Sequence, residues 1–228
     1  MTPLQKLDRP PAVENWARMQ HLDVDKTTKQ LVSFLTGIVP WNYSIAKSCA
    51  KWQIEDGIDR RTALHIVREK GSALGRKHNA EVVEAWFDFV AENPISGVRA
   101  FDDFVEWFPL GPGIRVPIKP LTVVRDQGHF SPVFFIPWSK IPFSDYQARL
   151  LFSILERSIF RHTDFEKSPG KIIFFPKVPT GSLGWQRKPS IWCRGDFDLL
   201  TDTQIIEQIE VFEASRERAK EWFEQNLG

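Results

Sequence analysis

One stretch near the end of the chain alternates positively charged side chains with indoles. The residues concerned are Lys177, Trp185, Arg187, Lys188, Trp192 and Arg194. In proteins that bind single-stranded nucleic acid, bases stack on aromatic rings while neighbouring cations pair with phosphates. The composition therefore predicts a nucleic-acid-binding surface. A hairpin whose tryptophans anchor it to the core is the alternative interpretation, and an exposed aromatic patch would equally suit a protein partner.

A second group of cations falls on two adjoining segments with helical patterning. Its members are Arg60, Arg61, Arg68, Lys70, Arg76, Lys77 and His78. We expect Arg76, Lys77 and His78, at the start of the second segment, to contact nucleic acid. The alternative for His78 is a solvated position on a helix surface.

No pattern points to covalent or metal catalysis. The five histidines lie outside metal-ligand spacings, and no nucleophile elbow, phosphate loop or dinucleotide fingerprint occurs. Asp102, Asp103 and Glu106 would share a helix face that is either solvated or holds a cation. Cys49 and Cys193 form no CxxC pair and are expected to be buried free thiols. The sequence thus predicts no catalytic residue, no metal ligand and no cofactor.

The first part of the chain has helical periodicity. Apolar residues recur every three or four positions in four segments, at about 25–37, 43–53, 59–70 and 76–92. Asn93-Pro94 closes this block. We therefore predict a flexible N-terminal arm over 1–12 and a helical region over 13–94.

After Pro94 the pattern changes to one of strands and two further helices. Residues 97–108 suggest a short helical turn and a strand, and further strands are expected at 114–124, 130–137, 171–176 and 190–195, with a loop at 177–189. Capping boxes begin helices at Ser144 and Thr201. The apolar residues expected to face inward from the last helix are Ile205, Ile206, Ile209, Phe212, Trp222 and Phe223. Residues 95–228 are therefore predicted to form a mixed-sheet core with a C-terminal helix, giving an α+β class.

Residues 70–180 resemble the PD-(D/E)XK nuclease superfamily, in particular its RecB-like branch. Gly75 to His78 is similar to the family's Gly…His motif, although one residue short. The strand at 114–124 and the segment 134–140 lie where the family has its Asp-bearing and Glu-x-Lys strands, and Gln147 lies on the following helix. The resemblance implies a helix, a three-stranded meander, a helix and a further strand.

The chain departs from the family at the residues that perform its chemistry. Active members need strand carboxylates to hold Mg²⁺. The strand residues are instead Ile118, Lys119 and Leu121 in the first strand, and Ile136, Pro137 and Trp138 in the second. Leu151 replaces the family's tyrosine. The resemblance therefore implies an inactive, nuclease-like protein. The alternative is a divergent Mg²⁺-dependent nuclease with carboxylates supplied by Asp102, Asp103 and Glu106, or by Glu81 and Glu84.

Composition narrows the class of protein. The chain is 42% hydrophobic and 26% charged, which is typical of a globular protein, and its net charge of +1 gives no broad field that attracts nucleic acid. The first residues lack a signal-peptide core and no run spans a bilayer, so we expect a cytoplasmic protein without membrane contact. We predict a non-catalytic nucleic-acid-binding or adaptor protein in DNA processing, defence or a mobile element. A protein-interaction module is the further alternative.

Overall fold

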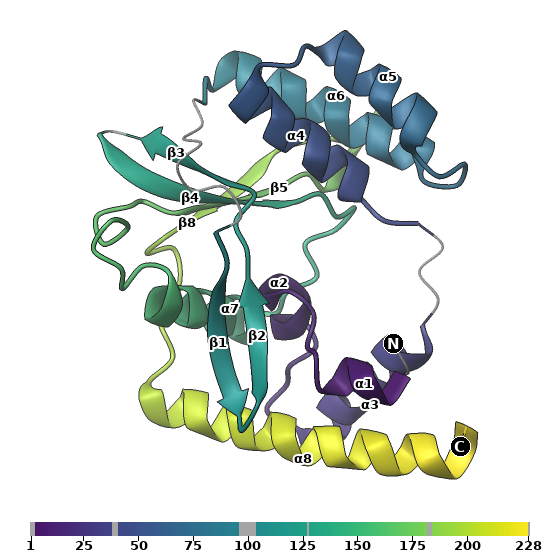
Figure 1. Ribbon diagram of the computed structural model, residues 1–228, viewed down its shortest axis with the longest axis vertical. Helices are drawn as coiled ribbons and strands as arrows, with labels where there is room; N and C mark the ends of the chain where they lie inside the picture. Colours follow the sequence, from purple (N-terminus) through teal and green to yellow (C-terminus); the bar gives the residue numbers. More distant parts are fainter. Residues whose placement is uncertain (1–2, 38–40, 96–103, 127, 182–183, 228) are drawn as a thin grey trace.

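The computed structural model describes residues 3–37, 41–95, 104–126, 128–181 and 184–227. These residues form an α+β fold, as predicted (Figure 1). The helices are α1 (Pro3–Leu7), α2 (Val13–Ala17), α3 (Val24–Thr36), α4 (Ser44–Asp56), α5 (Arg60–Lys70), α6 (Arg76–Glu92), α7 (Asp145–Ser158) and α8 (Asp202–Leu227). The strands are β1 (Glu106–Gly111), β2 (Ile114–Ile118), β3 (Thr122–Asp126), β4 (His129–Ile136), β5 (Lys171–Phe174), β6 (Lys177–Thr180), β7 (Gly184–Arg187) and β8 (Ser190–Cys193).

The central sheet has the strand order β3-β4-β5-β8. β3 and β4 are antiparallel, β4 and β5 are parallel, and β5 and β8 are antiparallel. The connection between the parallel strands runs through α7, because parallel neighbours need a long crossover. Two antiparallel pairs, β1-β2 and β6-β7, stand outside this sheet.

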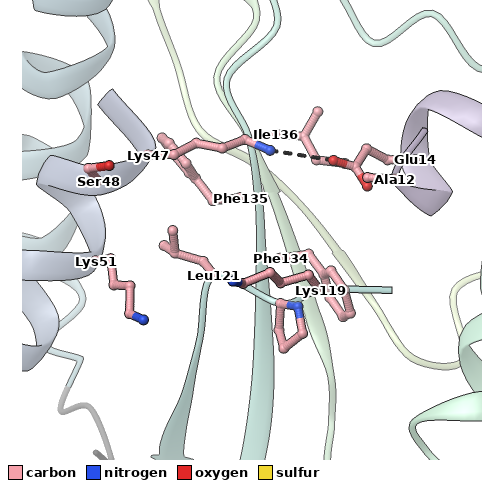
Figure 2. A pocket seen from close by; sticks show the side chains of 11 residues that line it. Ala12, Glu14, Lys47, Ser48, Lys51, Lys119, Leu121, Phe134, Phe135 and Ile136 are labelled. Atoms are coloured by element: carbon pink, nitrogen blue, oxygen red, sulfur yellow. Dashed lines mark hydrogen bonds and ion pairs between the residues drawn. The ribbon is translucent and has the colours of Figure 1, made fainter. Parts of the chain in front are cut away.

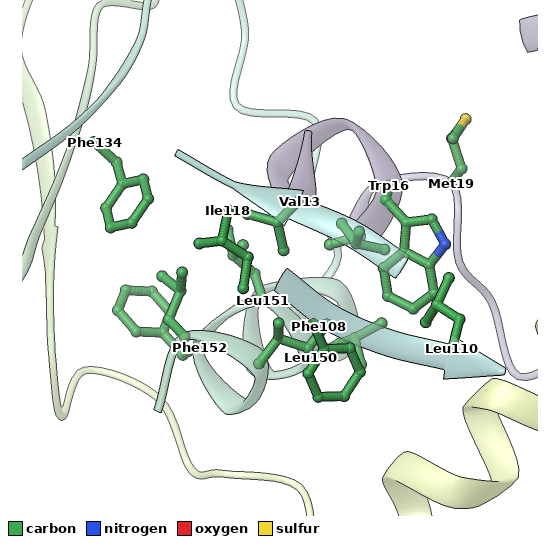
Figure 3. Close-up of a cluster of buried hydrophobic side chains, with 14 of the residues drawn as sticks. Val13, Trp16, Met19, Phe108, Leu110, Ile118, Phe134, Leu150, Leu151 and Phe152 are labelled. Atoms are coloured by element: carbon green, nitrogen blue, oxygen red, sulfur yellow. The ribbon is translucent and has the colours of Figure 1, made fainter. Parts of the chain in front are cut away.

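The two faces of the central sheet support two separate hydrophobic cores. Successive side chains of β4 point to opposite faces, so Phe134 and Ile136 join one core while Val133 and Phe135 join the other. The first core also takes apolar residues from α2, α7 and the β1-β2 pair (Figure 3). The helices α3 and α8 contribute to it as well. The second is covered by α4, α5 and α6, which lie together on the opposite side of the sheet (Figure 1).

The helical region predicted over 13–94 therefore divides between the two cores. Val13, Trp16 and Leu31, from α2 and α3, pack in the first core, whereas α4 to α6 form the second. The arm predicted at 1–12 also differs from the structure. Its described part contains α1, and Leu7 is buried against the first core because α1 packs on α3 and α8.

Helix starts agree with the capping chemistry of the sequence. The Ser144 hydroxyl accepts a hydrogen bond from the Gln147 backbone N–H, and the Gln147 side chain accepts one from the Ser144 N–H. Thr201 and Gln204 make the same reciprocal pair before α8. Both predicted capping boxes are thus confirmed, and each satisfies two N–H groups that have no partner within the helix.

Three predictions about apolar residues and strands were wrong. Ile206 and Trp222 are exposed, because α8 buries a single face, the one that carries Ile205 and Phe212. The strand expected at 114–124 is broken around Pro120, so β2 pairs with β1 while β3 pairs with β4. The loop expected at 177–189 contains the β6-β7 hairpin. The strand expected within 97–108 corresponds to β1, which begins at Glu106. Residues 97–103, where a helical turn was expected, lie outside the described residues.

Cys49 and Cys193 form no disulfide, and only Cys49 is buried as expected. Cys193 is half-buried, whereas Cys49 is fully buried with its Sγ 3.6 Å from the carbonyl oxygen of Ala63. Burial raises the pKa of the Cys49 thiol to about 11. None of the helices in the described part of the chain combines the length and apolarity needed to cross a bilayer.

Candidate functional site

The structure brings one part of the second predicted cationic group, residues 76–78, onto the same surface as the hairpin. Helix α6 lies beside β7 of the hairpin. One oxygen of Glu81, on α6, connects the two elements, since Glu81 Oε2 lies 2.7 Å from Lys177 Nζ and 3.8 Å from Arg187 Nε. The cations of residues 76–78 and those of the hairpin, 100 positions later in the chain, therefore belong to a single surface.

Arg187 is a buried structural residue within this surface. Its guanidinium donates hydrogen bonds to the carbonyl oxygens of Phe175, at 2.8 Å, and Pro137, at 3.0 Å. It also donates to the hydroxyl of Tyr43, at 2.8 Å. The side chain is only 2% exposed. Arg187 therefore has no access to a phosphate, and the prediction that it contacts nucleic acid was wrong. Its role is to attach the hairpin to the sheet and to α4.

Trp192 is half-buried and packs against the first core. Its ring packs edge-on against Phe174, with ring centroids 4.6 Å apart, and against Phe197 at 4.9 Å. Phe143 lies at 5.7 Å. These contacts agree with the anchoring interpretation of Trp192, and they occupy part of the ring that was predicted to stack on bases. By contrast Trp185 is 68% exposed.

Arg194 binds the protein itself. Its guanidinium pairs with the carboxylate of Glu156 on α7 and donates to the carbonyl oxygen of Glu166. Its guanidinium carbon Cζ lies 5.0 Å from the centroid of the Phe160 ring. These contacts join β8 to α7, so its cation is already compensated.

The remaining predicted residues provide the exposed part of the surface. Trp185, Lys188, Arg76 and Lys77 are exposed. In the hairpin register Trp185 opposes Pro179 and Arg187 opposes Lys177, so Trp185 shares a face with the two residues that reach Glu81. The Nε of Arg76 donates to the Gly71 carbonyl oxygen, which fixes the stem of that side chain. An exposed indole thus extends from the hairpin face that contacts α6.

His78 is held against an aromatic ring rather than free in solvent. Its imidazole stacks on Trp41, with ring centroids 4.5 Å apart and an angle of 15° between the planes. Its Nδ1 lies 3.8 Å from Glu81 Oε2. Sequence reasoning missed Trp41 and Tyr43, because neither belongs to a motif and both come next to His78 and Arg187 only through the packing of α4.

The electrostatics at Glu81 favour its charged form. Partial burial acts to raise the pKa of this carboxyl, but the hydrogen bond from Lys177 and the charges of Lys177, Arg187 and His78 outweigh it. The pKa of Glu81 is therefore lowered from its ordinary value of 4.5. At neutral pH Glu81 is an anion that organises the cations around it.

These contacts bear on the carboxylates considered for a divergent nuclease. Glu81 is bound by Lys177, and Glu84 lies 3.3 Å from Arg60. Glu106 Oε2 is 2.8 Å from Nε2 of His162, while Asp102 and Asp103 lie outside the described residues. Within the described ranges, no three His, Cys, Asp or Glu side chains come together as metal ligands. The geometry thus gives no support to Glu81 and Glu84 as metal ligands.

A pocket of about 300 Å³ opens beside the end of β4 (Figure 2). Lys47, Ser48 and Lys51 of α4 form one side and Lys119 approaches from the β2-β3 connection. Apolar side chains from β4 and its neighbours lie between them. No sequence motif marked these lysines.

Comparisons with known proteins do not place the chain in a family. No protein-family model matches it, and no significant match is found among curated proteins or solved structures.

Proposed function

We propose that this protein is a non-catalytic nucleic-acid-binding or adaptor protein. The observation that carries the proposal is the exposed Trp185 on a hairpin that α6 joins to Arg76 and Lys77, with Lys188 at the hairpin end. An exposed ring next to cations suits a single strand, because every base has a face that can stack while its phosphates pair with the cations. The surface is local, in agreement with a net charge of only +1.

The proposal includes a relationship to RecB-like nucleases. It is supported by the sequence resemblance and by the β4-α7-β5 unit, in which a helix connects two parallel strands after an antiparallel hairpin. Ile136, Pro137 and Trp138 provide no carboxylate at the end of β4. A cytoplasmic setting in DNA processing, defence or a mobile element is part of the same proposal and follows from the resemblance.

The test is fluorescence anisotropy of labelled single-stranded and duplex DNA over a salt series with Mg²⁺ present. We expect binding that weakens with salt, because bound cations release counterions from the phosphates. Trp185→Ala combined with Lys188→Ala should weaken single-strand binding about tenfold or more, since stacking of one base contributes ~1–3 kcal/mol. The salt slope should fall by about one for the lost lysine.

The matched control removes an exposed indole and a nearby lysine elsewhere. Trp222→Ala with Lys220→Ala changes the same residue types on α8, and should leave binding unchanged. Equal weakening by both double variants would contradict the proposed surface. Proteins that bind DNA non-specifically usually give a measurable anisotropy change at ~10 µM in low salt. If the wild type gives no change under these conditions, a protein partner for Trp185 would be favoured. Cleavage of the DNA with Mg²⁺ would instead support the divergent nuclease.

A further inference from the structure

The pocket beside β4 is created by the way the central sheet ends. The pairing of β3 with β4 begins at Thr122 and Val133, and the Leu121 N–H donates to the Val133 carbonyl oxygen at 2.7 Å. Phe134 to Ile136 continue past this point and pair with β5 on their other side. The chain before β3 turns away, and α2 and α4 flank the space it leaves (Figure 2).

The pocket has an apolar interior and a cationic rim. Pro120 and Leu121 form its apolar wall, next to the β4 residues Phe134 to Ile136. Lys47 and Lys51 lie one turn apart on α4, and Lys119 faces them across the opening (Figure 2). The lining therefore has three ammonium groups and one carboxylate, that of Glu14.

Two carboxylates lie close to the lysines of the rim. Lys47 Nζ is 3.4 Å from Glu14 Oε1, and Lys51 Nζ is 3.7 Å from Glu55 Oε2. A strong N⁺–H···O⁻ hydrogen bond spans about 2.7–2.9 Å. Glu14 and Glu55 hold the two amines at the rim, and an ammonium group with three N–H donors can bind an oxyanion in addition to a carboxylate partner.

We propose that this pocket binds a small organic anion, with a carboxylate, phosphate or sulfonate bound by the lysines and an apolar ring or chain against Leu121 and Pro120. Its volume of about 300 Å³ lies at the lower end of the range for small-molecule sites, which are typically apolar with a few convergent polar groups. A flat surface of lysines would bind any anion weakly, whereas the apolar interior selects for an anion with an apolar body. The proposal is independent of the Trp185 surface, and no residue that lines the pocket belongs to that surface.

The experiment compares two fluorescent probes that share one ring system. 8-Anilinonaphthalene-1-sulfonate carries an anionic group, and N-phenyl-1-naphthylamine is its neutral counterpart. We expect the wild-type protein to bind the sulfonate with at least about tenfold higher affinity, because two partly exposed ion pairs contribute on that order. Phenyl phosphate and benzoate should displace the sulfonate probe from the pocket. The competitor that displaces it at the lower concentration carries the preferred oxyanion.

Two variants change the pocket in different ways. Lys51→Gln with Lys119→Gln removes charge and should abolish the preference for the sulfonate over the neutral probe. Ser48→Phe adds a larger side chain to the pocket without changing its charge, and it should weaken the binding of both probes. The control, Lys29→Gln with Lys167→Gln, removes two exposed lysines elsewhere and should change neither affinity. Circular dichroism verifies that each variant is folded.

Two results would overturn the proposal. One is equal affinity of the wild type for the two probes, or no binding of either. The other is sulfonate binding that survives both pocket variants in folded protein. Neither result bears on DNA binding by Trp185, so the two proposals fail separately.

Discussion

The guanidinium of Arg187 connects segments that are far apart in the sequence. It donates to carbonyl oxygens after β4 and β5 and to the hydroxyl of Tyr43 at the start of α4. Planar geometry with several fixed donors lets one arginine satisfy all three acceptors. A lysine is a point donor on a flexible stem and has too few correctly placed N–H groups.

Arg187→Ala should lower the free energy of unfolding by about 3–5 kcal/mol, because it leaves two buried carbonyl oxygens and part of the Glu81 charge without partners. Arg187→Lys should recover only part of this loss. Urea unfolding measures both values. Trp185→Ala, two residues away and exposed, should change stability by less than about 0.5 kcal/mol. A similar small change for Arg187→Ala would show that its contacts are dispensable.

At the scale of elements, the β6-β7 hairpin is attached to α6 through one carboxylate. Lys177 and Arg187 come from the two paired strands, and both face Glu81. The pKa of Glu81 is lowered in the folded protein, so the Glu81 carboxylate stabilises the fold fully at pH values above 4.5, the ordinary pKa. This stabilisation is lost as the pH falls through the lowered pKa. The attachment of the hairpin should therefore weaken in acid.

Hydrogen exchange of the hairpin amides, corrected for intrinsic rates, tests this expectation. Protection of the hairpin amides against exchange should decrease below pH 4.5 in the wild type. The free energy of opening the hairpin should fall by about 1 kcal/mol, as expected for a partly buried ion pair. Glu81→Gln should show reduced protection already at neutral pH and little further change in acid. Glu84→Gln is the control, because Glu84 pairs with Arg60 and not with the hairpin. Identical acid profiles for wild type and Glu81→Gln would contradict the assigned role.

Element by element, the sequence predicted helices better than strands. Periodicity and caps located α3 to α8 within a few residues, since both are local features. The break at Pro120 was missed, and the β6-β7 hairpin was considered without its strand pairing, because pairing depends on partners distant in sequence. Prediction of the candidate site from the sequence is limited in the same way. The spacing of cations and indoles cannot separate the exposed Trp185 from the half-buried Trp192, since burial depends on partners such as Phe174 that are distant in sequence.

At the scale of the whole molecule, two cores share one sheet. Leu151 of α7 belongs to the first core and Phe89 of α6 to the second, and β4 and β5 contribute alternate side chains to each. Loss of packing on one face therefore removes support for the strands that hold the other. We expect the cores to unfold together.

Leu151→Ala and Phe89→Ala should each cost about 3 kcal/mol or more through the cavity that they leave. In urea, far-UV circular dichroism and tryptophan fluorescence should show coincident transitions for both variants, shifted as a whole. Leu74→Ala, at a residue that is 68% exposed, is the control and should move the midpoint little. Separate transitions, with each variant shifting only one, would show that the cores are independent.

The alternation of side chains along β4 also gives this strand a fixed parity. Replacing Phe135 changes the packing of one core alone, whereas inserting a single residue after Val133 would turn every later side chain of the strand to the opposite face. Homologous chains should therefore vary here in residue type far more readily than in length. A two-residue insertion, which restores parity, should be tolerated better than a one-residue insertion.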